Sequence, residues 1–92
     1  MMRIERTSEF KRDYKRLLKK HRDVSKLRNV LELIISGETE TLYRRYKNHF
    51  LKGQYKGYQE CHIEADWLLI YKVEQKRLVL VLTRTGSHDE LF

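Results

Sequence analysis

Cysteine, proline and long apolar segments are scarce in this sequence: it has one cysteine and no proline among its 92 residues. Cys61 alone cannot form an intramolecular disulfide, so a reducing compartment suits the chain. No apolar run approaches the roughly 18 residues that a membrane-spanning helix requires. A signal or transit peptide is not expected either, because acidic residues begin at Glu5. We therefore expect a cytoplasmic protein with no membrane partner.

Internal repeats, low-complexity stretches and linkers are also absent from the sequence. A chain of this length forms one core and buries about 60–65% of the surface that its unfolded form exposes. Hydrophobic residues make up 40% of the chain and charged residues 36%, which is typical of a globular domain with a highly charged surface. We expect one domain that covers residues 1–92.

Positive charge is concentrated in the first third of the chain. Residues 1–28 contain 11 Lys and Arg against 4 Asp and Glu, whereas the remaining residues balance, so the whole net charge of +7 lies in this segment. Such a patch favours a polyanion or an acidic protein as partner. A helix face exposed only to solvent would have the same composition, and charge alone does not separate the two interpretations.

The N-terminal part of the sequence predicts a strand and two helices. Residues 2–6 can form a short strand, Ser8 can cap a helix of about 12 residues, and Asp23 can cap a second helix. Ser36 and Gly37 end the second helix, because Gly tolerates the left-handed conformation found there. Joined by a few residues, the helices should pack as an antiparallel hairpin. The apolar residues at helical spacing are Phe10, Tyr14, Leu17 and Leu18, then Leu27, Val30, Leu31, Ile34 and Ile35.

The C-terminal part of the sequence predicts a sheet. Residues 38–56 have no firm period and indicate a loop that leads into a strand. Three strands are predicted at 58–63, 67–73 and 78–84, because these segments are rich in aromatic and β-branched residues. The apolar run Leu78–Leu82 indicates a central strand that is covered on both faces. The fold class is therefore α+β, with the helix hairpin on one face of a curved antiparallel sheet of four to five strands.

Three histidines lie in the part of the chain without net charge, each beside other polar residues: His49, His62 and His88. Cleavage of RNA without a metal needs a base for the ribose 2′-OH, an acid for the 5′-oxygen and a cation for the charge on the phosphorane. Histidine suits both proton transfers, since its unperturbed pKa of about 6.5 lies near cellular pH. Arginine suits the third role, because its planar fork matches two phosphate oxygens.

The residues around His88 supply the other groups of such a site. Arg84 precedes His88 by four positions, and Gly86 between them lets the backbone turn so that both side chains could face one phosphate. Asp66 could orient an imidazole or act as a base itself. Aromatic side chains that could stack on bases are Tyr55, Tyr58, Trp67 and Phe92, although a core position is an equally good interpretation for Trp67.

A zinc site and a cysteine nucleophile fit the sequence less well. Three histidines and Asp66 would satisfy zinc by number, but they form no compact ligand pair and Arg84 would be repelled by a dication. We therefore predict neither a metal nor a cofactor. Cys61 adjoins His62, but successive strand residues point to opposite faces, so a nucleophilic pair is not expected and Cys61 is predicted in the core.

The segments around His49, His62 and His88 resemble the YafQ branch of the RelE/ParE toxin superfamily. Two positions depart from the family pattern, with Gln59 in place of Arg and Ala65 in place of Pro. The resemblance covers residues 49–92, whereas residues 1–48 match only in length, charge and helical pattern. Its motifs are His49-x-Leu51-x-Gly53-x-x-Lys56-Gly57-Tyr58, His62-Ile63-x-x-Asp66-Trp67-Leu68-Leu69-Ile70-Tyr71 and Arg84-Thr85-Gly86-Ser87-His88-x-x-Leu91-Phe92.

The resemblance implies a compact α+β fold and a ribosome-dependent endoribonuclease that is the toxin of a toxin–antitoxin pair. It implies metal-free cleavage by attack of the 2′-OH, which gives a 2′,3′-cyclic phosphate. The implied partners are the ribosome with its mRNA, a cognate antitoxin in an inhibitory heterotetramer, and operator DNA through that antitoxin. The alternative is a ParE-like toxin that binds and inhibits gyrase without cutting RNA, and a third possibility is a catalytically silent binding module. The three histidines, Asp66 and Arg84 argue for the nuclease.

The resemblance also implies roles for single residues. Proton transfer is assigned to four residues, with His88 as the general acid, while Arg84 holds the phosphate and Phe92 positions the substrate. The four are His49, His62, Asp66 and His88. Further substrate contacts are expected from Lys52, Lys56 and Trp67. Since such toxins act in a ribosomal site walled by rRNA, the basic helix would dock on rRNA or on an acidic antitoxin segment through Lys11, Lys15, Lys19 and Lys20.

Overall fold

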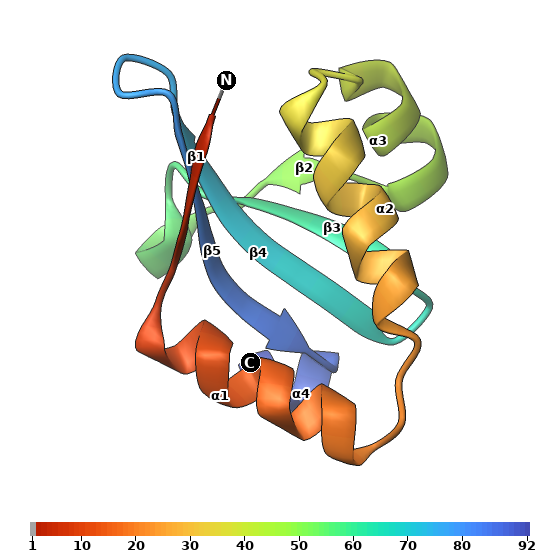
Figure 1. Cartoon of the computed structure of the whole chain (residues 1–92). Coiled ribbons are helices and arrows are strands. Elements are labelled where there is room, and N and C mark those ends of the chain that lie inside the picture. Colours follow the sequence, from red (N-terminus) through yellow and green to blue (C-terminus); the bar gives the residue numbers. More distant parts are fainter. Residues whose placement is uncertain (1) are drawn as a thin grey trace.

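Five strands form one sheet in the order β1-β5-β4-β3-β2 in the computed structural model, which describes residues 2–92 (Figure 1). β1 pairs with β5 in parallel, and the other neighbours are antiparallel. The sheet is therefore mixed, and the prediction of a purely antiparallel sheet was wrong. Parallel pairing needs a long crossover connection, and here every other helix and strand before β5 lies in that connection. The strands are β1 Arg3–Arg6, β2 His49–Phe50, β3 Gln59–Glu64, β4 Trp67–Glu74 and β5 Val79–Gly86.

Four α-helices lie within the described residues, together with one short 3-10 helix. The predicted limits of the first two helices are nearly right, although Thr7 rather than Ser8 caps α1: its Oγ1 accepts the N–H of Phe10 at 3.0 Å. Asp23 caps α2 as predicted, and Gly37 follows that helix with a φ of 71°. The helices are α1 Ser8–Lys19, α2 Val24–Ile35, α3 Thr39–Tyr46 and α4 His88–Leu91, and the 3-10 helix is η1 Gly53–Tyr55.

Residues 38–56 were expected to be a loop before a strand, and this prediction was wrong in part. The segment contains α3, β2 and η1. α3 escaped prediction because it is only 8 residues long, has no side-chain hydrogen bond at its N-cap Glu38, and buries only Leu42. So short a helix takes its stability from packing against α2 and β3 rather than from its own sequence.

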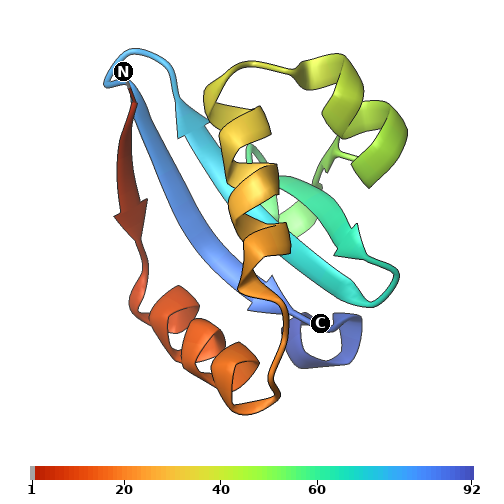
Figure 2. The same cartoon turned by 45° about the vertical axis from the view of Figure 1, so that its right-hand side comes forward.

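The predicted antiparallel helix hairpin is not formed. α1 packs mainly on β5, whereas α2 packs on α3 and β3. The two helices run in clearly different directions across the sheet (Figures 1 and 2). The connection between them includes His21 in the left-handed region, with a φ of 57°. Each helix thus buries its apolar stripe on the sheet instead of on the other helix.

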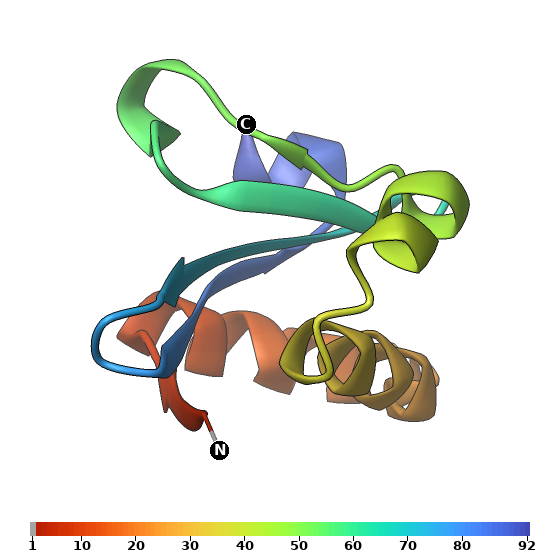
Figure 3. The ribbon, with the colours of Figure 1, turned by 90° about the horizontal axis from the view of Figure 1, so that it is seen from above.

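The two faces of the sheet are covered differently. α1 and α2 lie against one face, while the segment around η1 and the short α4 lie on the opposite side (Figure 3). The helix-covered face holds the larger core, to which β4 contributes Trp67, Leu69 and Tyr71. The second face, which we call the open face, holds a smaller cluster around Leu68, Ile70 and Leu91, with Leu51, Tyr55 and Tyr58 packed on it. Within residues 2–92, no helix combines the length and apolar character needed to cross a membrane.

Candidate active site

The register of the sheet brings four polar residues to the open face. Cross-strand partners point to the same side of a sheet. Register pairs His62 with Leu68, Arg84 with Ile70, and Glu60 with both Ile70 and His49. Because Leu68 and Ile70 belong to the open-face cluster, the side chains of His49, Glu60, His62 and Arg84 start from that face.

Glu60 joins two of the predicted histidines and was missed by the sequence analysis. Its Oε1 lies 3.5 Å from Nε2 of His49 and 3.8 Å from Nε2 of His62. The carboxylate is nearly buried, with 8% of the side chain exposed, whereas the two imidazoles are 50% and 32% exposed. A carboxylate at these distances attracts an imidazole that has taken up a proton. Its position could have been predicted, because Glu60 lies two residues before His62 and residues i and i+2 of a strand share a face.

One hydrogen bond of His49 fixes its tautomer. Nδ1 lies 2.9 Å from the carbonyl oxygen of Lys47, which can only accept a hydrogen bond, so Nδ1 carries a proton. Nε2 is therefore the nitrogen that faces Glu60. The orientation depends on Lys47, whose φ of 52° turns the chain between α3 and β2.

α4 carries His88 at its first position, and its start is held from two sides. Ser87 and Glu90 form a capping box, in which Ser87 Oγ accepts the Glu90 N–H and Glu90 Oε1 accepts the Ser87 N–H. The carboxylate of Asp66 accepts the backbone N–H of His88 at 3.2 Å. Asp66 thus contacts the backbone of His88, whereas the sequence predicted that it would orient an imidazole or act as a base. The His88 ring is exposed and lies 5.1 Å from the Phe92 ring.

The rings of Phe92, Tyr55 and Tyr58 form a row beside His88, which we call the aromatic wall. Phe92 contacts Tyr55 edge-on with ring centroids 6.1 Å apart, and Tyr55 contacts Tyr58 in the same way at 5.9 Å. Phe92 is 56% exposed and so offers part of its ring to solvent. The predicted substrate contacts Lys52 and Lys56 are exposed on either side of η1, in the segment that carries Tyr55.

Arg84 is paired with Asp13, a residue to which the sequence assigned no role. Its Nε donates to Oδ2 of Asp13 at 2.7 Å and its Nη2 to Oδ1 at 3.2 Å. The pKa of Arg84 is raised mainly by the hydrogen bond to Asp13, and Tyr55 raises it further. The guanidinium is thus anchored beside the aromatic wall instead of lying free at the end of β5.

Trp67 cannot stack on a base in this structure, and its predicted substrate contact is corrected. The side chain is 0% exposed and lies in the core of the helix-covered face. Its Nε1 donates to Oγ1 of Thr85 at 2.9 Å, and the guanidinium of Arg22 lies 5.5 Å from the ring centroid. The physical reason is strand alternation: Leu68 points to the open face, so its neighbour Trp67 points to the helices. Cys61 lies on the same side as Trp67, away from His62, and burial raises the pKa of its thiol to about 12.

Replacement of Trp67 is therefore expected to affect stability first. Trp67→Ala should destabilise the fold by about 3–5 kcal/mol, because a large buried ring leaves a cavity. For a domain of this size that lowers the melting temperature by at least about 12 °C, measured by circular dichroism. Trp67→Phe keeps most of the ring and serves as the matched variant, with a much smaller loss. A Trp67→Ala protein of wild-type melting temperature and reduced RNA affinity would restore the substrate role.

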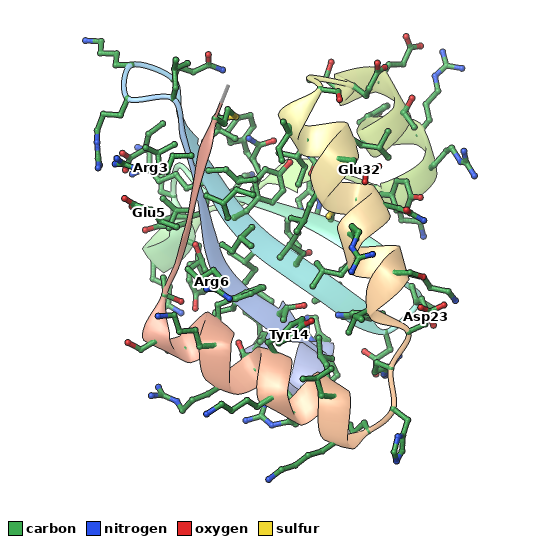
Figure 4. The ribbon with its side chains drawn as sticks, viewed as in Figure 1. Arg3, Glu5, Arg6, Tyr14, Asp23 and Glu32 are labelled. Atoms are coloured by element: carbon green, nitrogen blue, oxygen red, sulfur yellow. The ribbon has the colours of Figure 1, made fainter. Side chains whose placement is uncertain are left out.

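The basic helix α1 turns its charged side away from the sheet. Side chains with nitrogen tips extend from this side into solvent (Figure 4). Lys11, Lys15 and Lys19 are exposed there, as the docking prediction requires. Lys20 differs, because its Nζ lies 3.1 Å from Oε2 of Glu90 and so ties α1 to α4. The Ser87 N–H and, after it, Lys20 hold the pKa of Glu90 down at about 2, so this carboxylate stays charged at neutral pH.

Comparison with known proteins agrees with this fold. The model of the family described as "Bacterial toxin of type II toxin-antitoxin system, YafQ" matches residues 2–92. The mRNA interferase toxin YafQ of Escherichia coli (strain K12) is 42% identical over 89 residues, which cover 97% of this chain and 94% of that protein.

Solved structures give the same result. YafQ in the E. coli DinJ–YafQ complex superposes with a TM-score of 0.85 at 39% identity and covers 100% of this chain and 99% of that one. A metal-bound toxin from Helicobacter pylori superposes with a TM-score of 0.87 at 40% identity over 100% of both chains. The fold is thus that of a small α+β bacterial toxin. The chain belongs to the YafQ family of type II toxin–antitoxin systems.

Proposed function

We propose that this protein is an mRNA interferase, the toxin of a type II toxin–antitoxin pair, and that it cuts mRNA on the ribosome. The observation that carries the proposal is that His49, Glu60, His62 and Arg84 share the open face with the aromatic wall, whose Phe92 contacts His88. The name of the E. coli relative, an mRNA interferase toxin, supports the same activity. One domain of residues 1–92 carries it, and the protein works in the cytoplasm.

The chemistry needs one base, one acid and one cation. A base removes the proton of the 2′-OH, the 2′-oxygen attacks the adjacent phosphorus, and the 5′-oxygen leaves as it takes a proton from an acid. The products are a 2′,3′-cyclic phosphate and a 5′-hydroxyl. His88 is the acid, since its exposed imidazole stands next to Phe92 at the wall where the scissile nucleotide would lie. His49, His62 and Asp66 remain the base candidates, and Glu60 lies where it stabilises the charge of either imidazole once that ring has taken the proton.

The remaining groups bind the substrate. Arg84 stabilises the charge that builds on the phosphorane, with Asp13 holding part of its fork. Phe92 and Tyr55 receive an unstacked base, because single-stranded RNA is commonly bound by stacking on aromatic rings. Lys52 and Lys56 neutralise neighbouring phosphates. No step of this scheme uses a metal ion.

Regulation comes from a cognate antitoxin, as the DinJ–YafQ complex of E. coli suggests. The complex would be an inhibitory heterotetramer that binds operator DNA through the antitoxin. An acidic antitoxin segment would also find the exposed lysines of α1 attractive. The stoichiometry is measured directly by light scattering of the co-expressed pair.

The decisive experiment incubates the purified toxin with translating ribosomes and maps the 5′ ends of the mRNA. Cleavage that requires the ribosome, 5′-hydroxyl ends and an unchanged rate in EDTA are expected. EDTA is a necessary arm because the H. pylori relative was solved with metal bound. Restoration of activity by added zinc after EDTA treatment would overturn the metal-free scheme. Intact mRNA together with inhibition of gyrase supercoiling would favour the ParE-like alternative.

The basic side of α1 should provide salt-dependent affinity for rRNA. Replacing Lys11, Lys15 and Lys19 by Gln keeps good helix formers and removes three charges. Ribosome binding should weaken, and the log–log salt slope should become shallower by about 0.7–0.9 for each phosphate that the helix no longer neutralises. Lys20 is left in place because its bridge to Glu90 would confound the result.

The test measures ribosome affinity between low and high salt with antitoxin absent. Lys76→Gln serves as the single-charge control, because Lys76 is exposed in the turn between β4 and β5. This turn lies far from α1 (Figure 1). Wild-type affinity and slope in the triple variant would assign this side of α1 to the antitoxin or to solvent.

A further inference from the structure

A carboxylate occupies the apolar stripe of α1. Asp13 lies between Phe10 and Leu17 on the buried side of the helix, and its side chain is only 2% exposed. Burial of a charged group costs free energy unless hydrogen bonds and an opposite charge compensate it. An apolar residue at this position would pack on β5 without that cost, so the contacts that Asp13 makes point to a functional role.

Those contacts all go to the strand that leads to His88, apart from a weak one within α1. The two carboxylate oxygens accept Nε and Nη2 of Arg84, at 2.7 and 3.2 Å. Oδ2 also accepts the backbone N–H of Thr85 at 3.1 Å. Within α1, Nη1 of Arg16 lies 3.5 Å from Oδ1. Asp13 thus holds both a side chain and the backbone of β5.

The sheet topology explains why a side chain is needed at this point. β1 pairs with β5 only as far as Arg6 and Leu82, and the Thr7 N–H then bonds the carbonyl oxygen of Leu82. The chain next turns into α1, so Asp13 takes the Thr85 N–H that a longer strand would have bonded. The register of β5 against β4 shifts by one residue between Leu82 and Arg84, and this shift pairs Arg84 with Ile70 on the open face.

We propose that Asp13 is a positioning residue of the cleavage reaction, which holds the guanidinium of Arg84 in the orientation that meets the scissile phosphate. The inference rests on the proposed function. A guanidinium has five N–H groups, and Asp13 accepts from Nε and from one side of Nη2. Asp13 thus leaves both hydrogens of Nη1 and one of Nη2 on the side of Tyr55, where a phosphate oxygen can accept them. The Arg84 side chain is 22% exposed, so a phosphate can reach it while the fork stays fixed.

The test is a double-mutant cycle of Asp13→Asn and Arg84→Ala, with multiple-turnover cleavage of ribosome-bound mRNA as readout. In Asn, an NH2 group replaces one acceptor and faces the donors of Arg84 and Thr85. Asp13→Asn alone should lower kcat by about 10- to 100-fold with little change in KM, because misplacement of a catalytic group by about 1 Å has effects of this size. In the Arg84→Ala background the same substitution should change kcat by less than about threefold, since the group that it positions is gone.

Two control variants separate positioning from loss of stability. Asp23→Asn makes the same chemical change at the exposed N-cap of α2, where Asn caps as well as Asp, and should leave kcat unchanged. Val30→Ala removes volume from the fully buried side of α2 and lowers stability without touching the pair. Equal losses of kcat from Asp13→Asn in both backgrounds, or a loss no larger than that of Val30→Ala, would overturn the inference.

Two further readouts complement the cycle: the first does not need the Asp13→Asn protein, and the second does not need cleavage. Arg84→Lys keeps the charge but not the fork, and should lose nearly as much kcat as Arg84→Ala; a rate near wild type would contradict positioning by a bidentate contact. In NMR spectra the Nε–Hε group of Arg84 should exchange slowly with solvent in the wild type and rapidly after Asp13→Asn. If the wild type cuts no RNA, the proposed function fails, while slow exchange would still show that Asp13 holds Arg84.

Discussion

The protein with His88→Ala is expected to lose mRNA cleavage by about 10²–10⁴-fold, the usual cost of removing a general acid or base. The imidazole is exposed at the side of the Phe92 ring, so the fold should keep its melting temperature. The hydrogen bonds that define α4 come from the backbone of His88 and from Ser87, Glu90 and Asp66, and none involves the deleted ring. Cleavage rates on translating ribosomes and growth inhibition in cells measure the effect.

His21 provides the matched control for this variant. It is exposed in the turn between α1 and α2, and His21→Ala should cleave like the wild type. A pH–rate profile adds a diagnostic, because loss of the acid should remove the limb of the profile in which the rate falls as pH rises. A His88→Ala protein that cleaves at near wild-type rate would exclude His88 from proton transfer and leave the His49–Glu60–His62 cluster as the source of both base and acid.

Removal of the 2′-OH at the scission nucleotide should abolish cleavage altogether. If the 2′-oxygen is the nucleophile, a 2′-deoxy or 2′-O-methyl nucleotide leaves no group that can attack the phosphorus. The experiment places one such nucleotide in an mRNA at the mapped cut site and follows cleavage on the ribosome. Affinity of the toxin for the programmed ribosome should be unchanged, since phosphates and bases are still present.

The matched control for this experiment places the same modification one nucleotide further along the mRNA, where cleavage should proceed. Product ends provide a second check, since attack by the 2′-oxygen leaves a 5′-hydroxyl and a 2′,3′-cyclic phosphate. Cleavage of the blocked mRNA, or a product with a 5′-phosphate, would point to hydrolysis by water and would reopen the question of a metal ion.

Elements whose stability is local could be predicted from the sequence. Caps and helical periodicity predicted α1 and α2 nearly to the residue. Enrichment in aromatic and β-branched residues predicted β3, β4 and β5 within two residues at each end. Strand alternation also separated Cys61 from His62 correctly. These features depend on neighbours within a few positions, which the sequence displays directly. The family resemblance extended the prediction to the activity, because its motifs combine residue types with spacing.

Features that depend on distant partners were decided by the tertiary structure alone. Parallel pairing of β1 with β5 joins segments that no local pattern relates, and it separates α1 from α2 as each covers its own part of the sheet. The direction of Trp67 follows from the register of β4 against β3, which decides which residues face the helices. No local pattern distinguishes a core position from a substrate contact for this residue.

The same division runs through the candidate site. The chemistry of His49, His62, Arg84 and His88 could be predicted from the sequence, because it follows from their imidazole and guanidinium groups. Their neighbours could not be predicted. Glu60 contacts His49 only because β2 pairs with β3, and Asp13 contacts Arg84 across 71 positions of the chain. Hydrogen bonds and ion pairs act over a few ångströms whatever the separation in sequence. Residue chemistry was therefore predictable here, whereas the partners that orient those residues arose only when the sheet and α1 came together.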